Sequence, residues 1–291
     1  MSHTYLVPTD TARLLAQHIE KCQNFGLYLG RYIPRQVIDK ETAKLERGRW
    51  LRELCRSFKP DEALVKSSYE RWRAMTEGAA RFRARLHGRL IVGLGGKGAL
   101  EFGITLHRVT GLPYIPGSAL KGLTRTYFLL LLAERLEKKH KNISLDKLEE
   151  ALSEQKAGEL VKELDENFVK LYREMFGLQG NAGTCVFYDA VLAEPPKGQL
   201  FTVDVMTPHF VKYYRESGMQ PPSDDDNPNP VNYITVSEGV RFAFAIGKRR
   251  TTDKVHLADA RYLLQEALHM LGVGSKTASG YGVFEPPPKE A

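Results

Sequence analysis

The hydrophobic periodicity of this chain changes once, near residue 86, and that change limits the folds open to it. Apolar residues recur at helical spacing through the first eighty-odd residues, as in the stripe of Leu14, Leu15 and Ile19 behind an N-cap candidate, Asp10. From Leu86 onward, short alternating runs typical of strands are interspersed with helical stretches. This order of helices followed by mixed strands and helices predicts an α+β chain.

The elements expected after residue 85 are those of an antiparallel sheet backed by helices. The clearest is the last helix, whose apolar stripe runs from Ala260 to Leu271 and ends at Gly272. Ser118 is suited to cap an earlier helix, and Ser237 lies in the turn of an expected hairpin. Helices are predicted over 40–58, 61–85, 118–131, 144–175 and 260–271, and strands over 86–93, 102–106, 184–191, 200–206, 233–236, 240–246 and 281–285.

The basic residues are clustered. Five, with no acidic residue among them, stand between Arg81 and Gly98, and three more directly follow a predicted strand. A net charge of +7 favours a polyanionic partner, nucleic acid before a membrane surface. Cationic side chains bind phosphates by releasing counterions, although a solvated surface explains most charge runs. The candidates for phosphate contact are Arg81, Arg83, Arg85, Arg89, Lys97, Lys248, Arg249 and Arg250.

The cysteines and the apolar runs indicate the compartment. Cys22, Cys55 and Cys185 lie far apart, in odd number and without metal-binding spacing, as expected of a reducing environment. The first ten residues lack the pattern of a signal peptide, and the longest apolar run, Tyr127–Ala133, is far shorter than the roughly 20 residues that span a bilayer. We therefore expect a cytoplasmic protein with no disulfide, metal or membrane segment.

Two glycine motifs resemble nucleotide-binding loops without meeting their requirements. Gly93–Gly98 fits G-x-G-x-x-G, but a strand-like alternation follows it and no acidic residue stands about 20 positions on. Gly274-Ser-Lys-Thr277 lacks the second glycine of a P-loop and follows a helix. We expect no cofactor, and interpret the first motif as a turn between strands.

No arrangement of residues marks a catalytic centre. The eight histidines are scattered, and none is spaced as a metal pair or adjoins a plausible nucleophile. Asp189 and Asp204 lie on or beside strands, where a lone carboxylate more often serves a turn or salt bridge. No catalytic residue and no metal ligand is predicted.

Four segments in consistent order resemble a known family. Leu271–Phe284 resembles the glycine-rich loop of the RAMP superfamily, the ferredoxin-like RNA-binding proteins of CRISPR systems, and 115–125 resembles the segment that opens its first helix. More narrowly, 24–32, and 204–209 taken with 230–236, resemble the sixth subunits of Cmr-type, or type III-B, CRISPR effector complexes.

The resemblance implies an architecture. A ferredoxin-like (RRM-like) domain would occupy 86–285, with an antiparallel sheet backed by helices and a helical N-terminal region, 1–85, packed on it. A helical insertion would occupy about 140–176, and its charged stretch matches no known segment. A finger between guide and target would occupy about 207–233, and 286–291 would be a tail. Within the finger, the prolines and aspartates of 217–232 by themselves predict a mobile segment.

The resemblance also implies a role: a non-catalytic subunit that contacts guide RNA near its 3′ end and target RNA, beside other RAMP subunits that cut the target. The guide-contacting residues would be Gly272, Gly274, Lys276, Gly280 and Gly282 in the loop, with Lys121 and Arg125 in the first helix. Within the loop, Tyr281 offers a ring on which a base could stack.

Two other functions stay open. A metal-independent RAMP endoribonuclease that processes CRISPR transcripts would need a general base and a cation, which His87 or His107 with Lys276 could supply. A pure assembly protein would contact other subunits only, through the helical N-terminal region. Labelled RNA separates the three, since the outcomes are cleavage, binding without cleavage, or neither.

Overall fold

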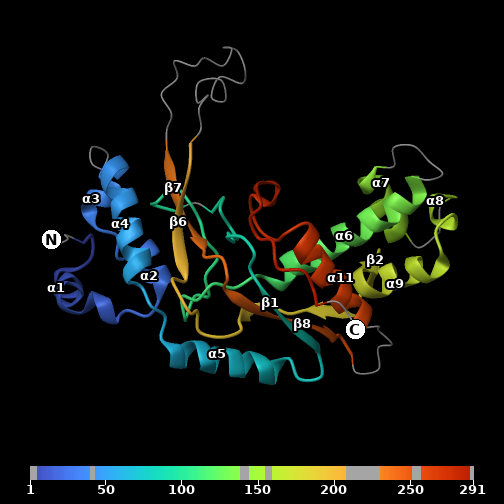
Figure 1. Cartoon of the computed structure of the whole chain (residues 1–291), viewed down its shortest axis with the longest axis horizontal. Helices are drawn as coiled ribbons and strands as arrows, with labels where there is room; N and C mark the ends of the chain where they lie inside the picture. Colours follow the sequence, from blue (N-terminus) through green and yellow to red (C-terminus); the bar gives the residue numbers. More distant parts are fainter. Residues whose placement is uncertain are drawn as a thin grey trace, which may run out of the picture. The chain divides into compact units, whose positions relative to one another are not determined.

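The chain folds into two compact units, each assembled from separated stretches of sequence (Figure 1). A computed structural model describes residues 5–39, 43–96, 98–137, 144–154, 159–207, 230–250 and 257–288. Unit 1 comprises Met1–Asp61, Ile91–Leu112 and Pro196–Ser237, and unit 2 comprises Glu62–Leu90, Pro113–Pro195 and Glu238–Ala291. Among the described helices, none combines the length and the apolar character needed to cross a membrane.

Unit 2 is built around β8 (Arg241–Lys248), to which the other strands of its sheet pair. β1 (Ala80–Arg85) lies along one side in antiparallel register, with Ala80 opposite Ile246 and Arg85 opposite Arg241. β4 (Cys185–Phe187) and β5 (Val191–Leu192) pair along the other side, also antiparallel. The α+β class and the antiparallel sheet predicted from the sequence are confirmed.

Alternating side-chain size lets β8 bury both of its faces. Phe244 projects to one face, where it stacks on Phe82 of β1 with ring centroids 4.9 Å apart. Ala243 and Ala245 project to the opposite face because successive residues of a strand alternate. Their small size leaves room for Trp72 to pack directly on the sheet. The strand therefore carries an unbroken apolar run and is covered on both sides.

Helices supply the two covering layers of unit 2. α5 (Glu62–Met75) carries Trp72 against one face, and α11 (Leu257–Met270) contacts β1 and β8 on the other, with α6 (Gly117–Glu137) packed beside it (Figure 1). Around this frame, the described part of the stretch expected as an insertion contains α7 (Leu145–Ser153), α8 (Glu159–Lys162) and α9 (Glu166–Phe176). A small hairpin of β2 (Gly177–Leu178) and β3 (Asn181–Ala182) follows it.

Asp189 fixes the start of α6. Its Oδ1 accepts a hydrogen bond of 2.7 Å from the Gly117 N–H, and its carbonyl accepts one of 2.8 Å from Trp72 Nε1. The prediction that Ser118 caps this helix is wrong, because the helix begins at Gly117 and a carboxylate distant in sequence satisfies its first N–H. Asp189 is thus a structural residue, one of the roles expected for it.

Unit 1 has an aromatic core beside a two-stranded antiparallel ribbon. Phe25 stacks on Phe201, with ring centroids 4.0 Å apart, and meets Phe58 at 4.7 Å. Asn24, in the segment 24–32 that resembles Cmr-type subunits, donates two hydrogen bonds of 3.0 Å to the carbonyls of Arg108 and Val109. The elements of unit 1 are α1 (Thr9–His18), η1 (Ile19–Lys21), α2 (Phe25–Gly30), α3 (Arg35–Ile38), α4 (Ala43–Ser57), β6 (Phe201–Met206) and β7 (Val231–Val236).

Predictions for two regions before residue 107 are wrong. The helix expected over 61–85 ends at Met75, followed by a turn containing Gly78 at φ +74°, and 80–85 is β1. The strands expected over 86–93 and 102–106 form a loop instead. Backbone hydrogen bonds from Thr105 to Val92 and from Gly103 to Leu94 close this loop, but its glycines offer few side chains for a ladder to pack.

Two predictions in the second half of the chain are also wrong. The hairpin around Ser237 does not form, because β7 pairs with β6 and β8 pairs with β1, β4 and β5. The strand expected over 281–285 is reduced to a single bridge between Phe284 and Leu86. Both errors are errors of pairing, and pairing partners distant in sequence leave no periodic signal.

Candidate nucleic-acid interface

The predicted RNA-contacting residues that the structure describes all fall in unit 2. They occupy four places: the outward face of β1, the loop after α11 with the segment 87–89 that packs against it, the first turns of α6, and the end of β8. Lys97 lies outside the described residues. So does most of the expected finger, 207–233, of which only 207 and 230–233 are described. At its base, Val231 of β7 pairs with Met206, the last residue of β6.

The outward face of β1 carries a row of arginines. Arg81, Arg83 and Arg85 are exposed and alternate with Phe82 and Ala84, which turn toward the interior. A strand that presents one charged and one apolar face has this two-residue period. Three residues of the basic cluster predicted from the sequence, Arg81, Arg83 and Arg85, thus form a single row of guanidinium groups on β1.

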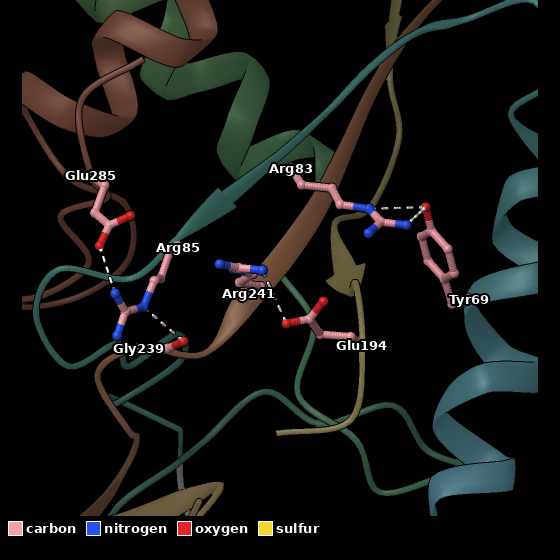
Figure 2. A network of polar contacts seen from close by, with 7 residues as sticks. All are labelled: Tyr69, Arg83, Arg85, Glu194, Gly239, Arg241 and Glu285. Atoms are coloured by element: carbon pink, nitrogen blue, oxygen red, sulfur yellow. Dashed lines mark hydrogen bonds and ion pairs between the residues drawn. The ribbon is translucent and has the colours of Figure 1, made fainter. Parts of the chain in front are cut away.

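The first two arginines of the row tie β1 to α5. Arg81 donates to the carbonyl of Arg73, in the last turn of the helix, at 3.1 Å. Arg83 donates from Nη2 to the Tyr69 hydroxyl at 2.8 Å, and its guanidinium carbon lies 5.0 Å from the centre of the same ring (Figure 2). A cation near a helix C-terminus or an aromatic face is stabilised electrostatically, so both contacts support the fold.

Arg85 lies at the other end of the row, beside Arg241, which is not among the phosphate contacts predicted from the sequence. Arg241 begins β8 directly opposite Arg85. Arg85 Nη1 contacts Glu285 Oε1 at 3.1 Å, and Arg241 Nη1 contacts Glu194 Oε1 at 3.3 Å (Figure 2). Arg85 Nε also donates to the Gly239 carbonyl at 3.4 Å. Only the strand register could have identified Arg241, since in sequence it is an isolated basic residue.

The glycine loop, residues 272–282, contains two kinds of glycine. Gly272 and Gly282 are buried at positive φ, and a Cβ at Gly282 would lie 1.9 Å from the Val273 carbonyl oxygen. Gly280 also has positive φ, at +82°, but a Cβ there would meet no atom within 4 Å. Gly274, at φ +98°, is exposed. Backbone packing therefore accounts for Gly272 and Gly282, and the space around Gly280 is open to a ligand.

Lys276 stands at the middle of the loop in a left-handed conformation. Its φ of +61° is uncommon for a residue with a side chain, and it precedes a short 3₁₀ turn, η2 (Thr277–Ser279). Its carbonyl accepts hydrogen bonds from Ser279 and from Tyr281, at 2.9 and 3.3 Å. The loop is thus held in one shape by its own backbone, with Lys276 partly exposed on it.

The segment 87–89 packs against this loop. The Gly282 N–H donates to the Arg89 carbonyl at 2.7 Å, and the His87 N–H donates to the Val283 carbonyl at 2.9 Å. Arg89 therefore belongs to the loop region rather than to the row on β1. His269 Nδ1 lies 3.1 Å from the Phe284 carbonyl oxygen, a structural contact between α11 and the segment that follows the loop.

The remaining predicted cations stand apart from the row. Lys121 and Arg125 lie one turn apart on α6, and Arg125 pairs with Glu149 of α7 at 2.9 Å. Lys248, Arg249 and Arg250 are exposed at the end of β8, where the Arg249 N–H donates to the Thr184 carbonyl at 2.7 Å.

Two buried cysteines are kept as neutral thiols. Burial raises the pKa of the Cys55 thiol to about 12, and it raises that of Cys185 to about 11 although nearby Lys121 opposes the shift. His107 Nδ1 lies 3.1 Å from Thr110 Oγ1 within a local turn. In the described ranges, no group of three or more His, Cys, Asp or Glu residues could hold a metal ion.

An antiparallel α+β unit with exposed guanidinium groups and a glycine loop closed by its own backbone hydrogen bonds is a candidate for binding a polyanion. The model of the RAMP superfamily matches residues 83–285, which include the end of β1, all of α6 and β8, and the glycine loop. The chain belongs to the RAMP superfamily, as the resemblance indicated.

Two relatives are similar to this chain within the superfamily. The Cmr subunit Cmr6 of the Pyrococcus furiosus CRISPR system is 35% identical over 67% of this chain and 64% of its own length. The Cmr6 subunit of Saccharolobus solfataricus is 27% identical over 80% of this chain and 68% of its own. The chain thus spans slightly less than two thirds of the first relative.

The solved structure supports the fold. A chain in the type III-B Cmr-β complex bound to cognate target RNA superimposes with a TM-score of 0.58 at 20% identity, over 96% of this chain and 86% of its own. These findings agree with the resemblance to Cmr-type sixth subunits predicted from the sequence.

Proposed function

We propose that this chain is a non-catalytic RNA-binding subunit of a type III-B CRISPR effector complex. In this role it contacts guide RNA near its 3′ end, faces target RNA, and packs beside other RAMP subunits that perform the cleavage. The observation that carries the proposal is the 35% identity to a Cmr6 subunit, over a stretch as long as two thirds of the chain. A cytoplasmic location, expected from the cysteines, is part of the proposal.

The chemistry of unit 2 supports a backbone-binding role. The exposed groups in the candidate interface are arginines, lysines and a loop held at positive φ, all of which can bind phosphates of the backbone. Affinity for RNA would then be mainly electrostatic and largely independent of sequence. The glycine loop and the row on β1 would be the two principal contacts.

Labelled single-stranded RNA tests the proposal against its alternatives. We expect the isolated chain to bind RNA and leave it intact. Cleavage without added metal would instead favour the endoribonuclease, in which His87 or His107 acts with Lys276. Failure to bind at low salt would favour an assembly protein. In a reconstituted effector, His87→Ala, His107→Ala and Asp204→Ala should leave target cleavage unchanged, and loss of cleavage with normal assembly would contradict the non-catalytic role.

A further inference from the structure

Arg85 and Arg241 form an unusual pair on the exposed sheet face. They are register partners on neighbouring strands, so two positive side chains stand directly across from each other. Like charges at such positions are destabilising unless anions neutralise them. Both side chains are about half exposed, at 51% and 49%. The position therefore requires anionic partners, yet remains accessible to solvent.

Two carboxylates from different segments supply that charge. Glu285 follows the glycine loop and reaches Arg85 at 3.1 Å, and Glu194 follows β5 and reaches Arg241 at 3.3 Å. Each ion pair joins a single guanidinium nitrogen to a single carboxylate oxygen. An arginine has five N–H donors and binds anions best through two parallel hydrogen bonds. Both pairs thus leave donors that a better-placed anion could use.

These ion pairs are also weak enough to exchange. Exposed salt bridges contribute little to stability, because water screens them and ordering two long side chains costs entropy. A phosphate accepts both hydrogen bonds of the guanidinium fork and can therefore compete with a carboxylate that uses one.

The carboxylates can leave without disturbing the fold. The Glu285 N–H donates to the Arg85 carbonyl at 2.9 Å, and the preceding residue, Phe284, is fully buried against Phe242 and Phe244. Ala193, which precedes Glu194, donates to the Arg241 carbonyl at 2.9 Å. In both cases the backbone is anchored independently of the carboxylate, so the side chain can rotate away.

A groove provides room for the incoming anion. It has a volume of about 330 Å³ and is lined by Arg83, Arg85 and Arg241, with Phe284 and the segment from Glu285 to Pro288 along its side. The groove thus joins the Arg85–Arg241 pair to Arg83, the next arginine of the row on β1.

We infer that Arg85 and Arg241 form one phosphate-binding site for the RNA backbone, and that Glu285 and Glu194 occupy it as intramolecular competitors when RNA is absent. The inference rests on the proposed function and identifies the ligand chemistry of this part of the interface. On binding, a phosphate displaces the two carboxylates, and Arg81 and Arg83 keep β1 attached to α5. By occupying the site, the carboxylates lower RNA affinity. In the RNA-free protein, they neutralise two adjacent cations that would otherwise repel each other.

Neutralising each competitor gives the sharpest test. Binding of a fluorescein-labelled single-stranded RNA to the full chain is measured at low salt for Glu285→Gln and Glu194→Gln. Each should bind about two- to fivefold more tightly than wild type, the change expected from removing one exposed ion pair. The matched control is Glu62→Gln on α5, which removes the same charge from a pair with Lys66 at 3.3 Å and should leave affinity unchanged.

Coupling to the arginine separates this mechanism from a general change in charge. The gain from Glu285→Gln should disappear when Arg85→Ala is already present, as a double-mutant cycle would report. If wild type binds RNA but neither glutamine variant binds more tightly, or if Glu62→Gln gains as much as they do, the inference is overturned and the proposed function stands. If wild type binds no RNA at all, both fall together.

Discussion

The glycine loop and the arginine row were both predicted to contact RNA, but the fold constrains them differently. In the loop, a Cβ at Gly282 would lie 1.9 Å from the Val273 carbonyl oxygen, so packing requires glycine at this position. Gly280, in contrast, has open space beside it. In the row, every arginine has a protein partner, yet each remains exposed. A glycine motif can therefore mark packing as well as binding, and a partnered cation can still be available to a ligand.

The largest expected effect is on stability, from substitution inside the loop. Gly282→Ala places a methyl group on the Val273 carbonyl oxygen at a residue with φ of +70°. Overpacking and left-handed strain together should lower the free energy of unfolding by about 3 kcal/mol or more. Thermal or urea unfolding measures the loss.

Gly280→Ala is the matched control within the same loop. It imposes a similar backbone strain, at φ of +82°, but meets no neighbouring atom within 4 Å. It should cost only about 1 to 2 kcal/mol. Equal losses for the two variants would mean that conformational strain alone governs the loop, and the division into packing and open glycines would be wrong.

The next effect is on binding rather than on folding. Lys276→Ala removes a point charge and leaves the residue in the same left-handed conformation, so the strain is shared by both proteins. RNA affinity should fall by about 1 kcal/mol, roughly fivefold, with the melting temperature nearly unchanged. Normal affinity at moderate salt would make the loop purely structural and remove Lys276 from the interface.

The smallest effect is expected where the row meets α5. Tyr69→Phe keeps the ring beside Arg83 and removes the hydroxyl that accepts its hydrogen bonds. Because this contact is solvent-accessible, the free energy of unfolding should fall by only about 0.5 kcal/mol. RNA affinity should not decrease, since the guanidinium gains free donors. A loss of affinity in a fluorescence titration would show that the Tyr69 hydroxyl orients Arg83 for binding.

The sequence predicted single elements better than it predicted partners. The apolar stripe of α11, the terminating Gly272 and the strand predicted over 200–206 follow from periodicity and glycine conformation. The stripe and the glycine are confirmed, and the strand is observed as β6, Phe201–Met206. The pairing of β8 with β1, instead of with β7, depends on contacts between residues far apart in sequence. Arg241 could not be predicted as a phosphate contact for the same reason, because only the strand register places it opposite Arg85.

The central claim is that unit 2 binds the RNA backbone through Arg85 and Arg241, whose carboxylate partners are displaced by a phosphate. Its most direct test is the salt dependence of RNA affinity for wild type and for the double variant Arg85→Ala, Arg241→Ala. The logarithm of affinity should fall linearly with the logarithm of salt concentration, and the slope should become shallower by about 0.7 for each phosphate contact removed. An unchanged slope in a double variant that still folds, or a flat response in wild type, would contradict the claim.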